Sequence, residues 1–130
     1  PVLMRWGALK SGENMIKIFD RNGNFLPIFR YPCLIIADNG LIYEDTEYSK
    51  LFPTAIGKID FLTGKIYGRD YYKIFSTVIG LVKEVNGTYE IYGKDYYKSF
   101  SYPIGYIRDG KYYTAKDYYS ILGTPSYYIE

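Results

Sequence analysis

Short apolar runs and glycine turns alternate along this chain, and the alternation repeats about every two dozen residues. Self-similarity at a fixed period is typical of one supersecondary unit stacked on copies of itself. The pattern therefore predicts a repeat architecture. Its copies cover residues 33–55, 56–78, 79–103 and 104–125, and the first copy is the most divergent.

Each copy predicts a β-hairpin. An apolar run such as Ile79–Val82 is followed by a glycine turn, here Asn86–Gly87, and then by a returning run, Glu90–Tyr92. Asn-Gly supplies the positive φ angles that a two-residue hairpin turn requires. A further hairpin ahead of the copies is predicted from Ile16–Phe19 and Phe25–Leu26.

A short linking segment follows each hairpin and contains an acidic residue. A carboxylate at this place is suited to cap a first helical turn, and the few residues that remain allow one turn only. Each segment ends in an apolar residue, which we expect to plug the core where two units meet. The acidic residues are Glu47, Asp70, Asp95 and Asp117, and the apolar residues are Phe52, Phe75, Phe100 and Leu122.

Side-chain alternation divides the returning strands into two faces. If one set of residues faces the core, the tyrosines beside them form a row that faces outward, and a register error of one residue would exchange the two sets. The inward set is Ile42, Ile66, Ile91 and Tyr112. The outward row is Tyr43, Tyr67, Tyr92 and Tyr113, flanked by Tyr71, Tyr96 and Tyr118 of the linking segments.

These elements predict an all-β fold of four to five hairpin repeats of about 22–25 residues, with short helical turns between the hairpins. Such a meander either coils as a solenoid or closes as a small barrel or a propeller-like array. A solenoid is favoured because the linking segments are too short for long crossovers. An open array would leave exposed sheet edges, which promote self-association.

A length of 130 residues predicts one domain, which we expect to cover residues 15–130. Residues 1–14 are expected to be an N-terminal arm or a cloning remnant, since Met15 is placed like a natural start. The longest apolar run is about five residues, too short to span a membrane. The single cysteine, Cys33, excludes an intrachain disulfide, which favours a cytoplasmic location but leaves a surface or secreted one open.

The residues that most catalytic and metal sites use are scarce in this chain. It has no histidine and one cysteine, which removes the commonest general base and the usual zinc ligand sets. The aspartates Asp70, Asp95 and Asp117 recur at one place in each copy, whereas an active site is needed once. We therefore expect no enzyme activity, no cofactor and no metal site.

Tyrosine is the unusual part of the composition, with 18 residues of this type. A tyrosine gives a large contact area and a hydrogen-bonding tip at low entropic cost. We therefore expect a module for protein binding or assembly that uses the outward row and its flanking tyrosines. A structural viral or coat component, in which the tyrosines serve packing, is an alternative. The net charge of +2 disfavours nucleic acid as a partner.

The segment Asp109–Tyr113 resembles the short aromatic hairpins of cell-wall- and glucan-binding repeat proteins. The resemblance extends over the turns and second strands between Asp38 and Tyr113. It implies a carbohydrate-binding alternative that would use the same tyrosines. The chain departs from those repeats in its single tryptophan and in the recurrent segment represented by Asp70–Lys73, so no ligand pocket of theirs is carried over.

Overall fold

In the part of the chain that the structure describes, the fold consists of ten short strands and two one-turn helices. The computed structural model describes residues 15–20, 32–48 and 50–129. The strands are β1 (Met15–Asp20), β2 (Pro32–Ala37), β3 (Leu41–Glu44), β4 (Gly57–Ile59), β5 (Lys65–Tyr67), β6 (Val78–Val85), β7 (Thr88–Tyr92), β8 (Gly105–Arg108), β9 (Lys111–Thr114) and β10 (Tyr127–Ile129). The helices are α2 (Asp45–Tyr48) and α3 (Ala115–Tyr118).

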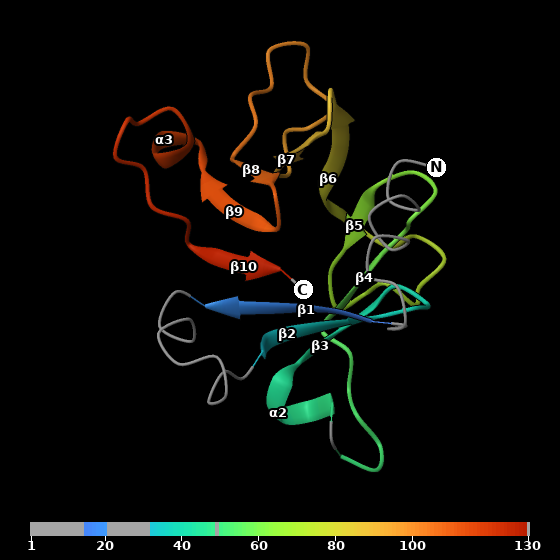
Figure 1. Cartoon of the computed structure of the whole chain (residues 1–130). Helices are drawn as coiled ribbons and strands as arrows, with labels where there is room; N and C mark the ends of the chain where they lie inside the picture. The colour runs from blue at the N-terminus through green and yellow to red at the C-terminus, as the bar shows by residue number, and fades with distance from the viewer. Residues whose placement is uncertain (1–14, 21–31, 49, 130) are drawn as a thin grey trace.

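The strands form one closed antiparallel barrel in which each strand pairs with its neighbours in the chain (Figure 1). The ring closes where β1 pairs with β10, with Ile18 opposite Ile129. The all-β meander of hairpins is confirmed, and of the predicted arrangements the structure adopts the closed barrel. The preference for an open solenoid, and the exposed sheet edges expected from it, are wrong because the first and last strands pair with each other.

Closure of the barrel also gives the first predicted strand a pairing partner that the sequence did not predict. Residues Ile16–Phe19 lie in β1, which pairs with both β10 and β2. Strand β1 therefore acts as the returning strand of a fifth hairpin unit whose first strand is β10. Its expected partner, Phe25–Leu26, lies outside the described residues, as does the arm predicted for residues 1–14.

The core lies inside the barrel and draws on all five hairpin units. The first strand of each unit contributes one buried aliphatic side chain: Ile36, Ile59, Val82, Ile107 and Ile129. The returning strands contribute a partly buried layer packed against it: Ile18, Ile42, Ile66, Ile91 and Tyr112. The inward set predicted from side-chain alternation is thereby confirmed. Each fully buried aliphatic side chain stabilises the barrel by roughly 1.5–3 kcal/mol through removal of apolar surface from water.

The hairpin turns follow the glycines of the sequence. In the β6–β7 turn, Asn86 and Gly87 have φ angles of 51° and 82°, and the β8–β9 turn has the same arrangement at Asp109 and Gly110. Positive φ at both central residues belongs to the turn type whose twist matches that of the flanking strands. The predicted two-residue hairpins are confirmed at these two sites.

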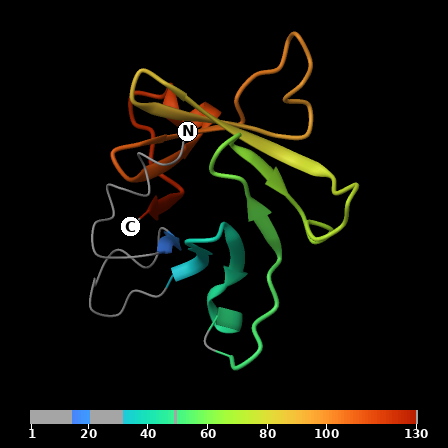
Figure 2. The same ribbon diagram turned by 90° about the vertical axis from the view of Figure 1, so that its right-hand side faces the viewer.

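Connections between hairpins lie at the opposite end of the barrel from the hairpin turns. This placement follows because the strands run alternately up and down around the whole ring. Four connections are described, at residues 45–56, 68–77, 93–104 and 115–126. They spread outward around the barrel: in both Figure 1 and Figure 2 the connection at 93–104 (orange) stands at the top and that at 45–56 (green) at the bottom.

The connections contain the short turns that the acidic residues predicted. The backbone carbonyl of each acidic residue accepts a hydrogen bond from the N–H three residues later, at 3.1 Å for Glu47, 2.9 Å for Asp70, 3.0 Å for Asp95 and 3.2 Å for Asp117. Two connections also contain a one-turn helix, α2 or α3. The expected helical turns between hairpins are present.

The predicted capping role of the acidic side chains is wrong. The N-cap of α3 is Thr114, whose hydroxyl accepts from the N–H of Asp117 at 3.2 Å. The carboxylate of Asp70 instead accepts from the N–H of Thr77 at 3.0 Å, across the base of the loop. The carboxylate of Asp95 lies 3.3 Å from Lys98 on the surface. The acids therefore shape the connections from positions inside them, not from their starts.

The predicted apolar plugs are also wrong. The terminal apolar residues of the connections point into solvent, with exposed fractions of 85% or more (Phe52, Phe75, Phe100 and Leu122). The physical reason is that side chains from the strands already fill the barrel interior. The connections lie outside its rim and have no core of their own to enter.

Candidate binding surfaces

The outward tyrosine row is half-buried along its whole length. Tyr43, Tyr67, Tyr92 and Tyr113 lie on the face of the returning strands opposite the core residues, and each is only partly accessible. The flanking tyrosines of the connections, Tyr71, Tyr96 and Tyr118, are half-buried as well. These seven residues therefore belong neither to the buried core nor to the fully exposed surface, and other parts of the chain cover them in part.

The connections themselves cover part of the row. Tyr43 packs edge-on against Tyr48 of α2, with ring centroids 5.4 Å apart. Tyr113 packs in the same way against Tyr118 of α3, at 5.9 Å. Each of these contacts joins a barrel strand to the connection that follows it. The outward tyrosines thus serve first as the base on which the connections rest.

The largest tyrosine cluster surrounds a residue that sequence reasoning missed. Tyr106 of β8 is 6% exposed and stacks on Tyr118, with ring centroids 4.2 Å apart. Its hydroxyl is hydrogen-bonded to that of Tyr119 at 2.9 Å. This hydrogen bond, followed by burial, raises the pKa of Tyr106 above its ordinary value. The pairing of Tyr106 with Tyr113 across β8 and β9 was the signal that could have found it.

Other tyrosine hydroxyls are also held in the protonated form. The hydroxyl of Tyr92 donates to a carboxylate oxygen of Glu90 at 2.9 Å on the outer face of β7. Partial burial, followed by this hydrogen bond, raises the pKa of Tyr92. The hydroxyls of Tyr92 and Tyr106 are therefore neutral hydrogen-bonding groups at ordinary pH.

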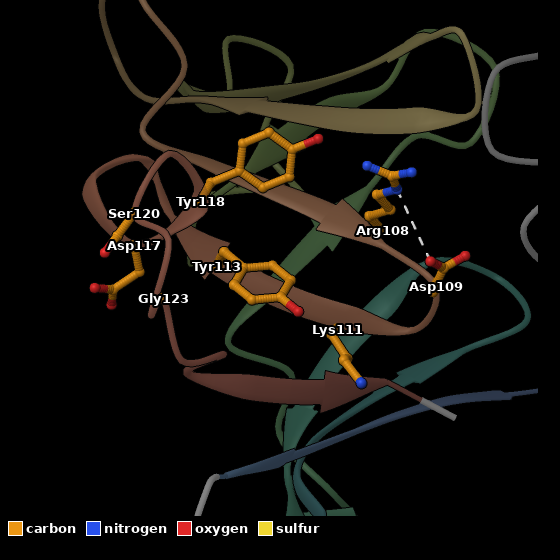
Figure 3. Close-up of a pocket in the computed structure, with 8 residues that line it drawn as sticks. All are labelled: Arg108, Asp109, Lys111, Tyr113, Asp117, Tyr118, Ser120 and Gly123. Carbon is orange, nitrogen blue, oxygen red and sulfur yellow. Dashed lines mark ion pairs between the residues drawn. The ribbon is translucent and has the colours of Figure 1, made fainter.

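Two shallow hollows on the outer face are each lined by a pair of tyrosines. The first has a volume of about 440 Å³ and contains Tyr113 and Tyr118. Figure 3 shows Asp117 and Ser120 on one side of these rings and the ion pair of Arg108 and Asp109 on the other. The second hollow, of about 490 Å³, has Tyr67 and Tyr71 at the equivalent places of an earlier repeat, with Lys58 and Asp60 nearby.

The tips of the connections are the most exposed apolar part of the described chain. Every described large apolar side chain that is more than 70% exposed lies in one of the four connections. These residues are Leu51, Phe52, Tyr72, Ile74, Phe75, Tyr97, Phe100, Tyr102, Tyr119, Ile121 and Leu122. We call them the apolar tips. Four of them, Phe52, Phe75, Phe100 and Leu122, were predicted to plug the core, since apolar residues of this kind are usually buried.

The described residues hold no cluster of three or more histidine, cysteine, aspartate or glutamate side chains placed to bind a metal ion. No helix in this part of the chain is long and apolar enough to cross a membrane. Comparison with protein-family models, with curated proteins and with solved structures gives no match. The function is therefore argued from the surfaces described above.

Proposed function

We propose that this protein is a non-enzymatic binding module that docks through the end of its barrel that carries the connections. The apolar tips carry the proposal. Soluble domains rarely leave large apolar patches in water, and such patches mark sites that are covered in the functional state. In this chain the described apolar side chains that are more than 70% exposed all lie at one end of the barrel, in the four described connections.

The recurring acids support a binding role over a catalytic one. Asp70 holds the N–H of Thr77, Asp95 faces Lys98, and Asp117 lies within α3. The carboxylates of Asp70 and Asp95 thus each have a partner within their own connection. A catalytic carboxylate would instead be expected once, with an environment unlike that of its counterparts in the other repeats.

Protein binding or assembly, which the tyrosines predicted, is one way in which the apolar tips become covered. The half-buried tyrosine row would then support the docking surface from behind. Tyr67 and Tyr92 keep part of their surface accessible, as a contribution to a partner contact requires.

The proposal is tested by removing the tips and following the protein in extracts of cells that make it. A variant with Phe52→Ser, Phe75→Ser, Phe100→Ser and Leu122→Ser is compared with the wild type by sedimentation. We expect the wild type to travel with larger material and the variant to stay free. Leu62→Ser is the matched control, since Leu62 is 69% exposed but lies in the β4–β5 turn at the other end. Equal sedimentation of wild type and tip variant would contradict the proposal.

Carbohydrate binding is a second candidate, supported by the two tyrosine-lined hollows. Both hollows combine two tyrosine rings with charged side chains, and both tyrosine pairs occupy the same two places of the repeat. Sugar rings pack on aromatic faces and hydrogen-bond to such polar neighbours. Retention on insoluble polysaccharide should fall when Tyr67→Ala or Tyr118→Ala is introduced. Unchanged retention of both variants would count against this candidate.

A further inference from the structure

The connections share an order of residue types from the barrel outward. In the connection between β5 and β6, Tyr71 is half-buried and Tyr72 is 72% exposed. Lys73 follows, and Ile74 and Phe75 at the end are both 93% exposed. Exposure therefore rises along this connection from the half-buried Tyr71 to Ile74 and Phe75, with the cation of Lys73 between the tyrosines and the purely apolar residues.

Other connections repeat this order. A lysine lies shortly before the apolar tip in three of the four connections: Lys50 and Lys73 directly precede it, and Lys98 is separated from Phe100 by one serine. The fourth has Ser120 at that place and Lys116 in α3 behind it. A tyrosine precedes the lysine by one or two residues in the first three. Because the order recurs in separate loops, the surface that the tips meet must offer the same chemistry at several places.

This order matches the depth profile of a membrane surface. Leucine, isoleucine and phenylalanine enter the hydrocarbon boundary, whereas tyrosine prefers the headgroup level. Lysine keeps its ammonium group in water beside the headgroups while its stem covers apolar surface. Anionic headgroups attract such lysines. One insertion depth therefore suits all three residue types at once.

The spread of the connections also favours a broad, uniform partner. The connections that carry the tips lie at one end of the barrel and spread around it, with those at 93–104 and 45–56 on opposite sides (Figures 1 and 2). A folded protein would need matching apolar pockets at each of these distant places. A lipid surface offers the same environment at every place, and several weak anchors on one rigid body add their affinities.

We propose that the connection-bearing end docks onto the surface of an anionic lipid bilayer, with the apolar tips inserted and the lysines at the headgroups. This inference rests on the proposed docking function and names its partner. Two of the lysines have carboxylate neighbours, Glu47 at 2.9 Å from Lys50 and Asp95 at 3.3 Å from Lys98. Such exposed ion pairs are weak, so these lysines stay available to phosphate and carboxylate headgroups.

The test is flotation of the purified full chain with vesicles. One set contains phosphatidylcholine with about a quarter phosphatidylserine, and the other phosphatidylcholine alone. We expect the wild type to float with the first set. Ile74→Ser with Phe75→Ser should weaken this binding roughly tenfold or more, because two apolar anchors are lost. Lys73→Gln should weaken binding to the anionic vesicles about fivefold and leave flotation with phosphatidylcholine unchanged.

Leu62→Ser serves again as the control and should float like the wild type. A urea unfolding midpoint equal to that of the wild type shows that the tip variant is folded. The proposal is overturned if the wild type does not float, or if the tip variant floats as well as the wild type. Failure on vesicles together with tip-dependent sedimentation in extracts would remove the lipid partner and keep the docking function. Absence of a tip effect in both assays would remove both.

Discussion

The barrel wall and the connections use the same apolar residue types in opposite ways. Ile59 in β4 is 3% exposed, whereas Ile74, in the connection that follows β5, is 93% exposed. In the wall, backbone pairing alternates the side chains, and the inner face has a closed space to fill. In the connections no such pairing orients the side chains. The difference shows that backbone pairing between strands, and not hydrophobicity alone, decides which isoleucines of this chain form the core.

The largest expected effect separates these two isoleucines directly. Ile59→Ala should lower the free energy of unfolding by about 2–5 kcal/mol, because it leaves a cavity in the barrel core. Ile74→Ala should change it by no more than about 0.5 kcal/mol. Urea unfolding of both variants measures the difference. Equal losses would mean that the tip of this connection is buried in solution.

A second pair of variants compares two hairpin turns, one packed against a neighbouring strand and one open to solvent. Gly64 has a φ of 79°, and a Cβ there would collide with the backbone carbonyl oxygen of Val82. Gly87 has a similar φ of 82°, but a Cβ there meets open space. Gly64→Ala should therefore cost roughly 2–4 kcal/mol of stability, and Gly87→Ala about 1 kcal/mol. The same urea experiment applies, and a larger loss at Gly87 would contradict the described packing.

Tyr106 joins the barrel wall to the last described connection. Its raised pKa predicts that the stability of the fold decreases at alkaline pH. Because the folded state raises this pKa, protonated Tyr106 stabilises the fold fully below the ordinary tyrosine pKa of about 10. That contribution is lost as pH rises through the folded-state pKa. Tyr106→Phe should cost about 1 kcal/mol at neutral pH through the lost hydrogen bond to Tyr119.

Unfolding of wild type and Tyr106→Phe from about pH 8 to about pH 11, a range that brackets the ordinary tyrosine pKa, measures this dependence. The stability of the wild type should fall more steeply at the alkaline end than that of the variant. Parallel curves would show that the hydroxyl of Tyr106 is not protected in the fold.

The smallest expected effect concerns the start of that connection. Thr114→Ala removes the hydroxyl that accepts from the N–H of Asp117 and should cost about 0.5–1 kcal/mol. Asp95→Ala, at the exposed acid of the preceding connection, should cost less than about 0.5 kcal/mol. Thermal unfolding of the two variants tests the ranking. The reverse ranking would restore the capping role that the sequence predicted for the acids.

Much of the wall was predictable from the sequence because its signals are local. Turn pairs such as Asn86–Gly87 fix the hairpins, and alternation at Ile66 and Tyr67 assigns the two faces. Barrel closure was not predictable in this way. It depends on β1 meeting β10, two strands at opposite ends of the described chain whose pairing leaves no local pattern.

The candidate surfaces were predictable only in part. The outward tyrosine row follows from alternation, and its partial cover depends on where the connections fold back. Phe52, Phe75, Phe100 and Leu122 were predicted to be buried because each ends a short linking segment and is a typical core residue in type. A lysine at or near the start of the tip, as at Lys73, was the available sign of a solvent-exposed end.

The closing pair of β1 and β10 also limits how this protein can associate. Every described strand already has a hydrogen-bonded neighbour on each side. An incoming peptide cannot add itself to the sheet, and two barrels cannot merge into a continuous one through their backbones. A partner of the described barrel would therefore have to be recognised by side chains, so single substitutions on its surface should be able to abolish or redirect binding without altering the barrel.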